Sequence, residues 1–276
     1  MAAGDVAKRV RESVSGVIKG TGDVLNGTAE TVRDTLVMTV KGSGEAAKDV
    51  TAAATEVITA AIHAVGEVGG SLVDVVKGAV IGVLEGVNEI TTVSTNAVSN
   101  AMRTVITSTQ EIGGDIAAAA SGTAQAAITA TTSVAMDVEQ TAISVGRGAI
   151  LGAKDVGSDV VGAARDTIEG VVKGAMEITG DVIGAIENTA KGLVKGAGEV
   201  GADIADVAKG AVTGAIATAK DVGLNVEDAA SAAATGALAG AADFGQAAVD
   251  AVKKVVTGDV DGVKVKPKGK STRSRP

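Results

Sequence analysis

The chain has 276 residues and a net charge of −8, and it contains no Cys, Trp or Tyr and only one Phe. Without cysteine there are no disulfides, thiolate metal sites or Cys nucleophiles, and a single histidine leaves little other metal or acid–base chemistry. Because the aromatic side chains that dominate most cores and pockets are missing, Val, Ala and Ile must supply the apolar surface, and we do not expect an enzyme.

The N-terminal residues show no secretory signal. The basic residues Lys8, Arg9 and Arg11 follow the first few positions, but no apolar segment comes after them. We therefore expect a cytoplasmic protein, at most peripheral on a membrane or lipid body.

A 22-residue repeat organises the chain from Asp23 onwards. An acidic residue followed by an apolar one returns every 22 residues, and only Ser133 breaks the acidic series. Since 22 residues in six turns give 3.67 residues per turn, the pattern predicts an apolar stripe along a nearly straight or slightly right-handed helix. This predicted interaction stripe includes Val24, Val68, Ile90, Ile112, Val134, Val156, Ile178, Val200, Val222 and Phe244.

The predicted fold is all-α without a β-sheet: one very long amphipathic helix, or a few long helices, over residues 1–263. Proline occurs only at Pro267 and Pro276, and the expected hinges are Gly69–Gly70 and Gly113–Gly114. Each helical glycine costs about 1 kcal/mol relative to alanine, so an exposed helix should be unstable. We expect folding to be conditional on lipid, another copy or another part of the chain covering the stripe.

Pairs of glycines four residues apart occupy the same two places in several repeats. One interpretation is close packing against another helix or a surface, because small residues let backbones approach. The other interpretation is low-complexity drift of a repeat rich in Ala, Gly and Val. The candidate close-packing glycines are Gly82, Gly86, Gly148, Gly152, Gly170, Gly174, Gly192 and Gly196.

Charge is sparse in the centre of the chain, at about residues 89–136. Arg103 is the only charge between Glu89 and Glu111, and residues 116–136 have none. The latter stretch has the length of about 20 residues that spans a bilayer, but its many Ser, Thr and Gln residues argue against a transmembrane helix.

The titratable residues do not suggest a reaction. The acids recur along a solvated face as part of the repeat, and His63 stands where other repeats have lysine, without partners for a metal ion. We predict no catalytic, cofactor-binding or metal-binding residue, no cofactor and no small-molecule substrate.

Residues 264–276 form a separate basic segment with no apolar repeat, which we predict to be a disordered tail. It is either a solvated terminus or an electrostatic tether to an anionic membrane, nucleic acid or acidic partner. Its basic residues are Lys264, Lys266, Lys268, Lys270, Arg273 and Arg275.

The hendecad repeats, the absence of Trp and Tyr, and the segments 171–177 and 191–199 resemble the amphipathic 11-residue repeat class. This class includes group 3 late embryogenesis abundant proteins, synucleins and exchangeable apolipoproteins, and the resemblance covers about residues 1–263. It implies disorder in solution, helix formation on lipid or on drying, and roles in lipid binding or in protecting membranes and proteins.

The first functional prediction is an amphipathic protein that binds a lipid or membrane interface, with a coating or stress-protective role. The alternative is a structural protein whose stripes assemble into a right-handed bundle or filament. A minor alternative, from the Ala- and Thr-rich residues 116–132, is a helical antifreeze-like protein. The expected partners are a lipid interface or other copies of the chain.

Overall fold

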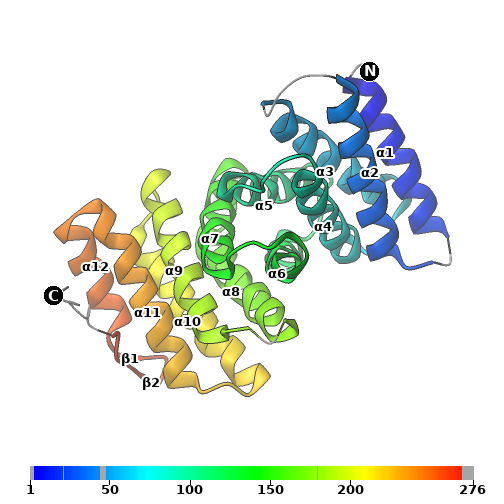
Figure 1. Cartoon of the computed structure of the whole chain (residues 1–276). Coiled ribbons are helices and arrows are strands. Elements are labelled where there is room, and N and C mark those ends of the chain that lie inside the picture. The colour runs from blue at the N-terminus through cyan, green and yellow to red at the C-terminus, as the bar shows by residue number, and fades with distance from the viewer. Residues whose placement is uncertain (1–2, 21, 44–47, 179, 269–276) are drawn as a thin grey trace.

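The computed structural model describes residues 3–20, 22–43, 48–178 and 180–268, and over these residues the backbone forms a succession of short helices (Figure 1). A 3-10 turn, η1 (Ala242–Phe244), precedes the last helix, and strands β1 (Gly258–Val260) and β2 (Val263–Val265) follow it. The helices are α1 (Ala3–Lys19), α2 (Val24–Ser43), α3 (Lys48–Val68), α4 (Leu72–Ile90), α5 (Thr95–Glu111), α6 (Ile116–Val134), α7 (Val138–Asp155), α8 (Val160–Glu177), α9 (Val182–Glu199), α10 (Ile204–Val222), α11 (Val226–Ala241) and α12 (Gln246–Val256).

The prediction of one very long helix or a few long helices is wrong, because the helix ends in each repeat. For example, α7 ends at Asp155, Val156 is its cap residue, and Gly157 has a positive φ of 66°. The Ser158 N–H then donates to the Ala153 carbonyl oxygen over 2.9 Å. This is a Schellman-type end, in which glycine is favoured because it has no Cβ to strain the left-handed conformation.

The next helix begins because an aspartate follows two residues after this glycine. Asp159 accepts a hydrogen bond from the Val161 N–H at 2.9 Å, and Asp181 accepts one from the Gly184 N–H at 2.9 Å. Such a cap satisfies an N–H group that a helix start leaves without a partner, and contributes about 1 kcal/mol. Helices α6 to α10 all begin with an aspartate cap, formed by Asp115, Asp137, Asp159, Asp181 and Asp203.

The helices stack in two layers. Each helix packs mainly against the helix two places before it and the one two places after it, so odd-numbered and even-numbered helices form separate layers. Because short loops join consecutive helices, neighbours in the chain are antiparallel and helices within a layer are parallel. The first and last helices lie at opposite ends of the stack (Figure 1). This is the architecture of a helical solenoid, in which each unit contacts only its neighbours.

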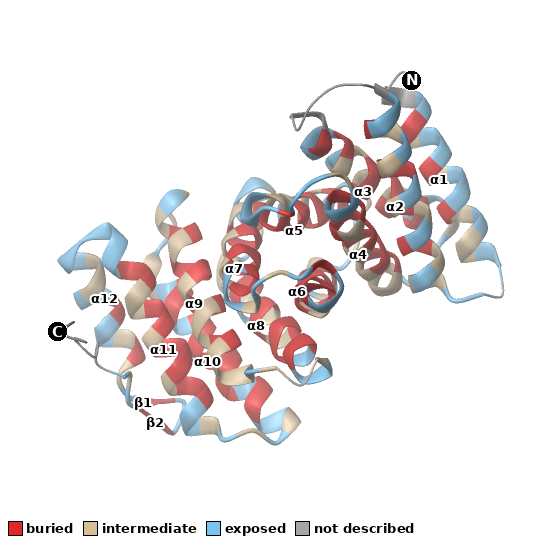
Figure 2. Cartoon of the chain, viewed as in Figure 1, coloured by how far each residue is buried: buried red, intermediate tan, exposed pale blue. Residues whose placement is uncertain are grey.

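The apolar face of each helix is covered by other helices of the same chain. Buried residues line the faces that the helices turn toward one another, and exposed residues lie on the outside and at the loops (Figure 2). Leu84, Ile150, Ile168, Ile186 and Leu193 are among the fully buried side chains. Lipid, another copy or another part of the same chain could have covered these apolar faces. In the structure, other helices of the same chain cover them, and neither lipid nor a second copy is needed.

A β-hairpin follows the last helix, so the prediction of no β-sheet is also wrong. Strands β1 and β2 pair antiparallel, and the segment after β2 lies along α11. The Lys266 and Lys268 N–H groups donate to Ser231 Oγ and Thr235 Oγ1 at 3.1 and 3.0 Å. The predicted boundary at residue 263 thus falls inside the hairpin, and Lys264 belongs to a strand. Lys270, Arg273 and Arg275 lie outside the described residues.

The sparsely charged centre of the chain forms α5 and α6, which lie in different layers of the stack. Among the described residues, no helix combines the length and the apolar character needed to cross a bilayer.

Candidate ligand pocket between helices α3, α4 and α5

The ten residues of the predicted interaction stripe lie at helix ends and do not form a continuous stripe. Nine of them begin, end or cap an α-helix, and Phe244 lies in η1. Because consecutive helices are antiparallel, these positions alternate between the two sides of the stack on which the loops lie. Val134 is buried, whereas the Phe244 side chain is 39% exposed. Most of the others are partly buried, and those that pack against the core are Val24, Ile90, Ile112, Val156, Ile178, Val200 and Val222.

The structure places all eight candidate close-packing glycines against the helix two places earlier in the chain. A methyl group at Gly174 would lie 2.7 Å from the Gln125 carbonyl oxygen, and one at Gly196 would lie 2.9 Å from the Arg147 carbonyl oxygen. These distances are too short for a side chain, so the helices of one layer approach to backbone contact at these points. The same applies to Gly82, Gly148, Gly170 and Gly192, which face backbone or Cβ atoms of the earlier helix, whereas Gly86 and Gly152 leave distances of 3.0–3.1 Å that are only tight for a methyl group.

In several repeats, the acid at the start of the repeat forms a bond within a layer. Glu89 pairs with Lys41 at 3.0 Å and Glu199 pairs with Arg147 at 2.8 Å, in each case across to the helix two places earlier. His63 Nε2 lies 2.9 Å from the Glu111 carboxylate and so occupies the place of these basic residues. In the described part of the chain, no group of three or more His, Cys, Asp or Glu side chains could hold a metal ion.

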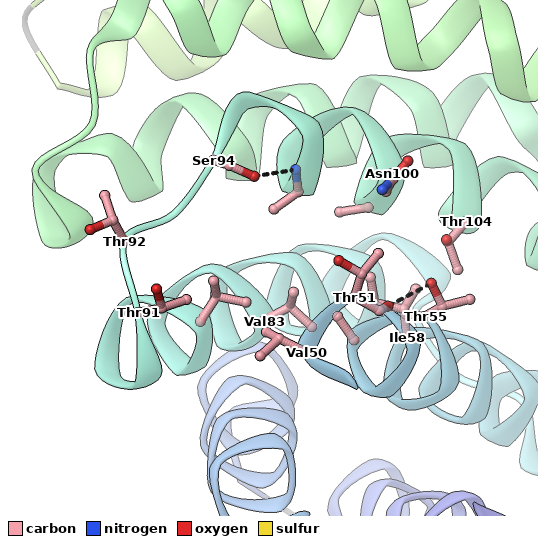
Figure 3. A pocket seen from close by; sticks show the side chains of 14 residues that line it. Val50, Thr51, Thr55, Ile58, Val83, Thr91, Thr92, Ser94, Asn100 and Thr104 are labelled. Atoms are coloured by element: carbon pink, nitrogen blue, oxygen red, sulfur yellow. Dashed lines mark hydrogen bonds between the residues drawn. The ribbon is translucent and has the colours of Figure 1, made fainter. Parts of the chain in front are cut away.

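One opening between the helices differs from this close packing. It has a volume of about 190 Å³ and lies between α3, α4 and α5, beside the loop that joins α4 to α5 (Figure 3). Its apolar wall contains Val50 and Ile58 from α3 and Val83 and Val87 from α4. Threonine side chains from α3, the loop and α5 surround this wall, so the pocket is apolar inside and carries hydroxyl groups at its edge.

The pocket forms where the glycine register is interrupted. In the repeat that contains α5, the two glycine places are occupied by Thr104 and Ser108, and α5 has no glycine at all. On α3, Thr55 lies opposite Thr104 in the pocket (Figure 3), and Thr59 Oγ1 lies 3.0 Å from Ser108 Oγ. Side chains therefore separate α3 from α5 where backbones meet elsewhere. These two helices are the most loosely packed neighbours in the odd-numbered layer.

The loop between α4 and α5 also departs from the repeat. Thr91 caps α4 in an extended conformation, with a φ of −158°, in the place where most repeats have glycine with a positive φ. Ser94 then starts α5 by accepting a hydrogen bond from the Ala97 N–H at 3.3 Å. This loop brings Thr91, Thr92 and Ser94 to the pocket.

No charged side chain lines the pocket. The Thr55 hydroxyl donates to the Thr51 carbonyl oxygen at 3.0 Å, which satisfies it within α3. The Thr104 hydroxyl and the Asn100 amide form no hydrogen bond with another described residue, although Thr104 is only 8% exposed. A hydroxyl and an amide are thus available to a bound molecule, and the pocket has no acid, base or nucleophilic thiol for catalysis.

Sequence periodicity alone did not identify this pocket. The available signal was the change from glycine to Thr104 and Ser108 at two places of the repeat, next to a loop without glycine. No protein-family model matches the chain, and no curated protein matches it. The functional argument therefore depends on the geometry of the helices and the pocket.

Proposed function

We propose that the protein is a non-catalytic helical-repeat scaffold that binds a small uncharged molecule in the pocket between α3, α4 and α5. The observation that supports this function is the interruption of the glycine register at Thr104, which lines an apolar pocket between α3 and α5, whereas α7, α9 and α11 further along the layer meet at glycines. Pockets that bind small molecules are typically apolar with a few polar groups that orient the ligand.

The distribution of charge supports a binding role without catalysis. Many of the acids that recur in the repeat take part in helix caps or in ion pairs between helices, as Asp181 and Glu199 do. An acid–base or nucleophilic mechanism needs titratable groups beside the bound molecule. The pocket lining contributes only aliphatic side chains, hydroxyls and one amide.

The other functional predictions require changes to this architecture. Lipid binding through the apolar faces of the helices would require the two layers to separate, since these faces form the core of the stack. Assembly of the apolar faces of several copies into a right-handed bundle or filament would likewise require the two layers to separate. We retain a cytoplasmic protein with peripheral membrane contact as the setting of the proposed function.

A ligand-observed NMR screen with small uncharged compounds tests this function. Ala54 lines the pocket and is half-buried, whereas Ala52 is exposed on the same helix and does not line it. We expect compounds to bind the wild-type protein and the Ala52→Leu variant, and to lose binding in Ala54→Leu because the three added carbon atoms occupy the pocket. Compounds that bind all three proteins equally would contradict a role for this pocket.

A further inference from the structure

We infer that the ligand of the α3–α4–α5 pocket is an aliphatic chain of about six to eight carbon atoms with an uncharged hydrogen-bonding end. An engineered apolar cavity of about 150 Å³ accepts a six-carbon molecule such as benzene, so the present volume of about 190 Å³ suits a slightly larger one. This inference depends on the proposed binding function and specifies the chemistry of its ligand.

The wall of the pocket favours an aliphatic chain. Ile58, Val83 and Val87 present branched aliphatic groups, and the described lining contains no aromatic ring and no methionine. Contacts between such groups and a bound chain are dispersive and lack direction, so affinity should follow the number of methylene groups that leave water. Each buried methylene corresponds to about a fourfold gain in affinity.

The polar edge of the pocket favours an uncharged end group. The free Thr104 hydroxyl can donate or accept a hydrogen bond, and the Asn100 amide can do both at once. Neither group compensates a full charge, and no charged side chain lines the pocket. A carboxylate or ammonium group that entered would lose its hydration without gaining an ion pair, which disfavours charged ligands.

The apolar part of this ligand has two sources, namely a free small amphiphile or the methyl end of a membrane lipid's chain, and only the amphiphile also brings a hydrogen-bonding group. The pocket is partly open to the surface beside Thr51 and Thr92, which are both exposed. A free molecule can enter there as a whole. A lipid can insert only the end of a chain, so its binding would bring the protein to a membrane.

Three six-carbon probes at pH 7 test the ligand class: 1-hexanol, hexanoate and hexylammonium. We expect titration calorimetry to show that 1-hexanol binds and that both charged probes bind at least about tenfold more weakly. Affinity should rise about fourfold per methylene from butanol to about octanol and then level off. Equal binding of hexanoate and hexanol would overturn the inference, while leaving the proposed pocket function intact.

The Ala54→Leu and Ala52→Leu variants assign the binding to this pocket. Hexanol binding should be lost in Ala54→Leu and retained in Ala52→Leu, and circular dichroism establishes that both variants are folded. Should Ala54→Leu fail to fold, the comparison of the three probes on the wild-type protein still decides the ligand class. If neither hexanol nor any compound of the uncharged screen binds, the proposed function and this inference both fail.

Sedimentation with neutral phosphatidylcholine vesicles separates the two sources. Cosedimentation of the wild-type protein that is lost in Ala54→Leu would support the chain of a membrane lipid. Hexanol binding without cosedimentation would support a free small amphiphile.

Discussion

Two parts of the odd-numbered layer differ in how closely their helices approach. Between α7, α9 and α11, Gly192 and Gly236 face backbone atoms of the preceding helix in the layer, and no side chain separates the two. Between α3 and α5, the Thr59 and Ser108 side chains meet, and Thr55 and Thr104 line a pocket of about 190 Å³. The same place in the repeat thus holds Gly192 at a closed interface and Thr104 beside a pocket.

The largest expected effect comes from adding a methyl group to the close interface. In Gly192→Ala the new Cβ would clash with the Ile143 carbonyl oxygen, so the helices must move apart. We expect a loss of at least about 2 kcal/mol in the free energy of unfolding, measured by urea denaturation.

Gly16→Ala is the matched control, since Gly16 occupies the same place of the repeat in α1 and nothing lies within 4 Å of its added Cβ. This variant should gain about 0.5–1 kcal/mol from the better helix propensity of alanine. Similar destabilisation in both variants would show that helix propensity, and not the backbone contact, governs the glycine places.

The variant Thr104→Gly should make the interface between α3 and α5 resemble the closely packed interfaces between α7, α9 and α11. Removing the side chain lets α5 approach Thr55 on α3, so we expect the pocket to contract and hexanol affinity to fall at least about tenfold. The free energy of unfolding should change by less than about 1 kcal/mol, because threonine and glycine differ by only a few tenths in helix propensity. Unchanged hexanol affinity would contradict the spacing role of Thr104.

The loss of a helix cap should lower the free energy of unfolding by an intermediate amount. Asp181→Ala removes the acceptor of the Gly184 N–H and should cost about 1 kcal/mol in unfolding free energy. Asp181→Asn keeps a capping side chain and should change stability by only a few tenths. In a continuous long helix, Asp181→Ala would instead stabilise the protein, because alanine has a higher helix propensity than aspartate. Stabilisation by Asp181→Ala would therefore argue against separate helices.

The smallest effects are expected from the ion pairs between helices. Glu199→Gln breaks the pair with Arg147, whose two side chains are 38% and 35% exposed, so the loss should be at most about 0.5 kcal/mol. Glu111→Gln should cost less, because its partner His63 is charged only when protonated. Both differences should vanish in 1 M salt, where the Debye length is about 3 Å, and a loss that persists there would point to packing.

The sequence predicted the helical class but not the helix ends. One helix of about 18 residues plus a loop of four has the same length as six continuous turns, so the 22-residue phase does not distinguish the two. The local signals were present: Gly157 in the left-handed conformation and Asp159 as a cap occur within three residues. The expected hinge at Gly113–Gly114 lies at a helix break, but other repeats break in the same way.

The pocket was harder to predict than the fold. Its existence depends on how far apart α3 and α5 lie, and this distance follows from residues that face each other across 49 positions of the chain, such as Thr55 and Thr104. Periodicity identifies which side of a helix is apolar but not which helix covers it. Once the two layers are known, the change from glycine to Thr104 in the repeat becomes informative.

The pairing of helices two places apart also bears on how the chain folds. Contacts within a layer join residues about two repeats apart, and the first and last described helices, α1 and α12, do not meet. In such linear arrays, structure can nucleate at any pair of units and spread to its neighbours. The cooperativity of unfolding then depends on the interface with the weakest packing. Because α3 packs loosely on α5, helices α1 to α3 can unfold separately from helices α7 to α11. Amide hydrogen exchange should accordingly be slowest between α7 and α11 and faster in α1 to α3.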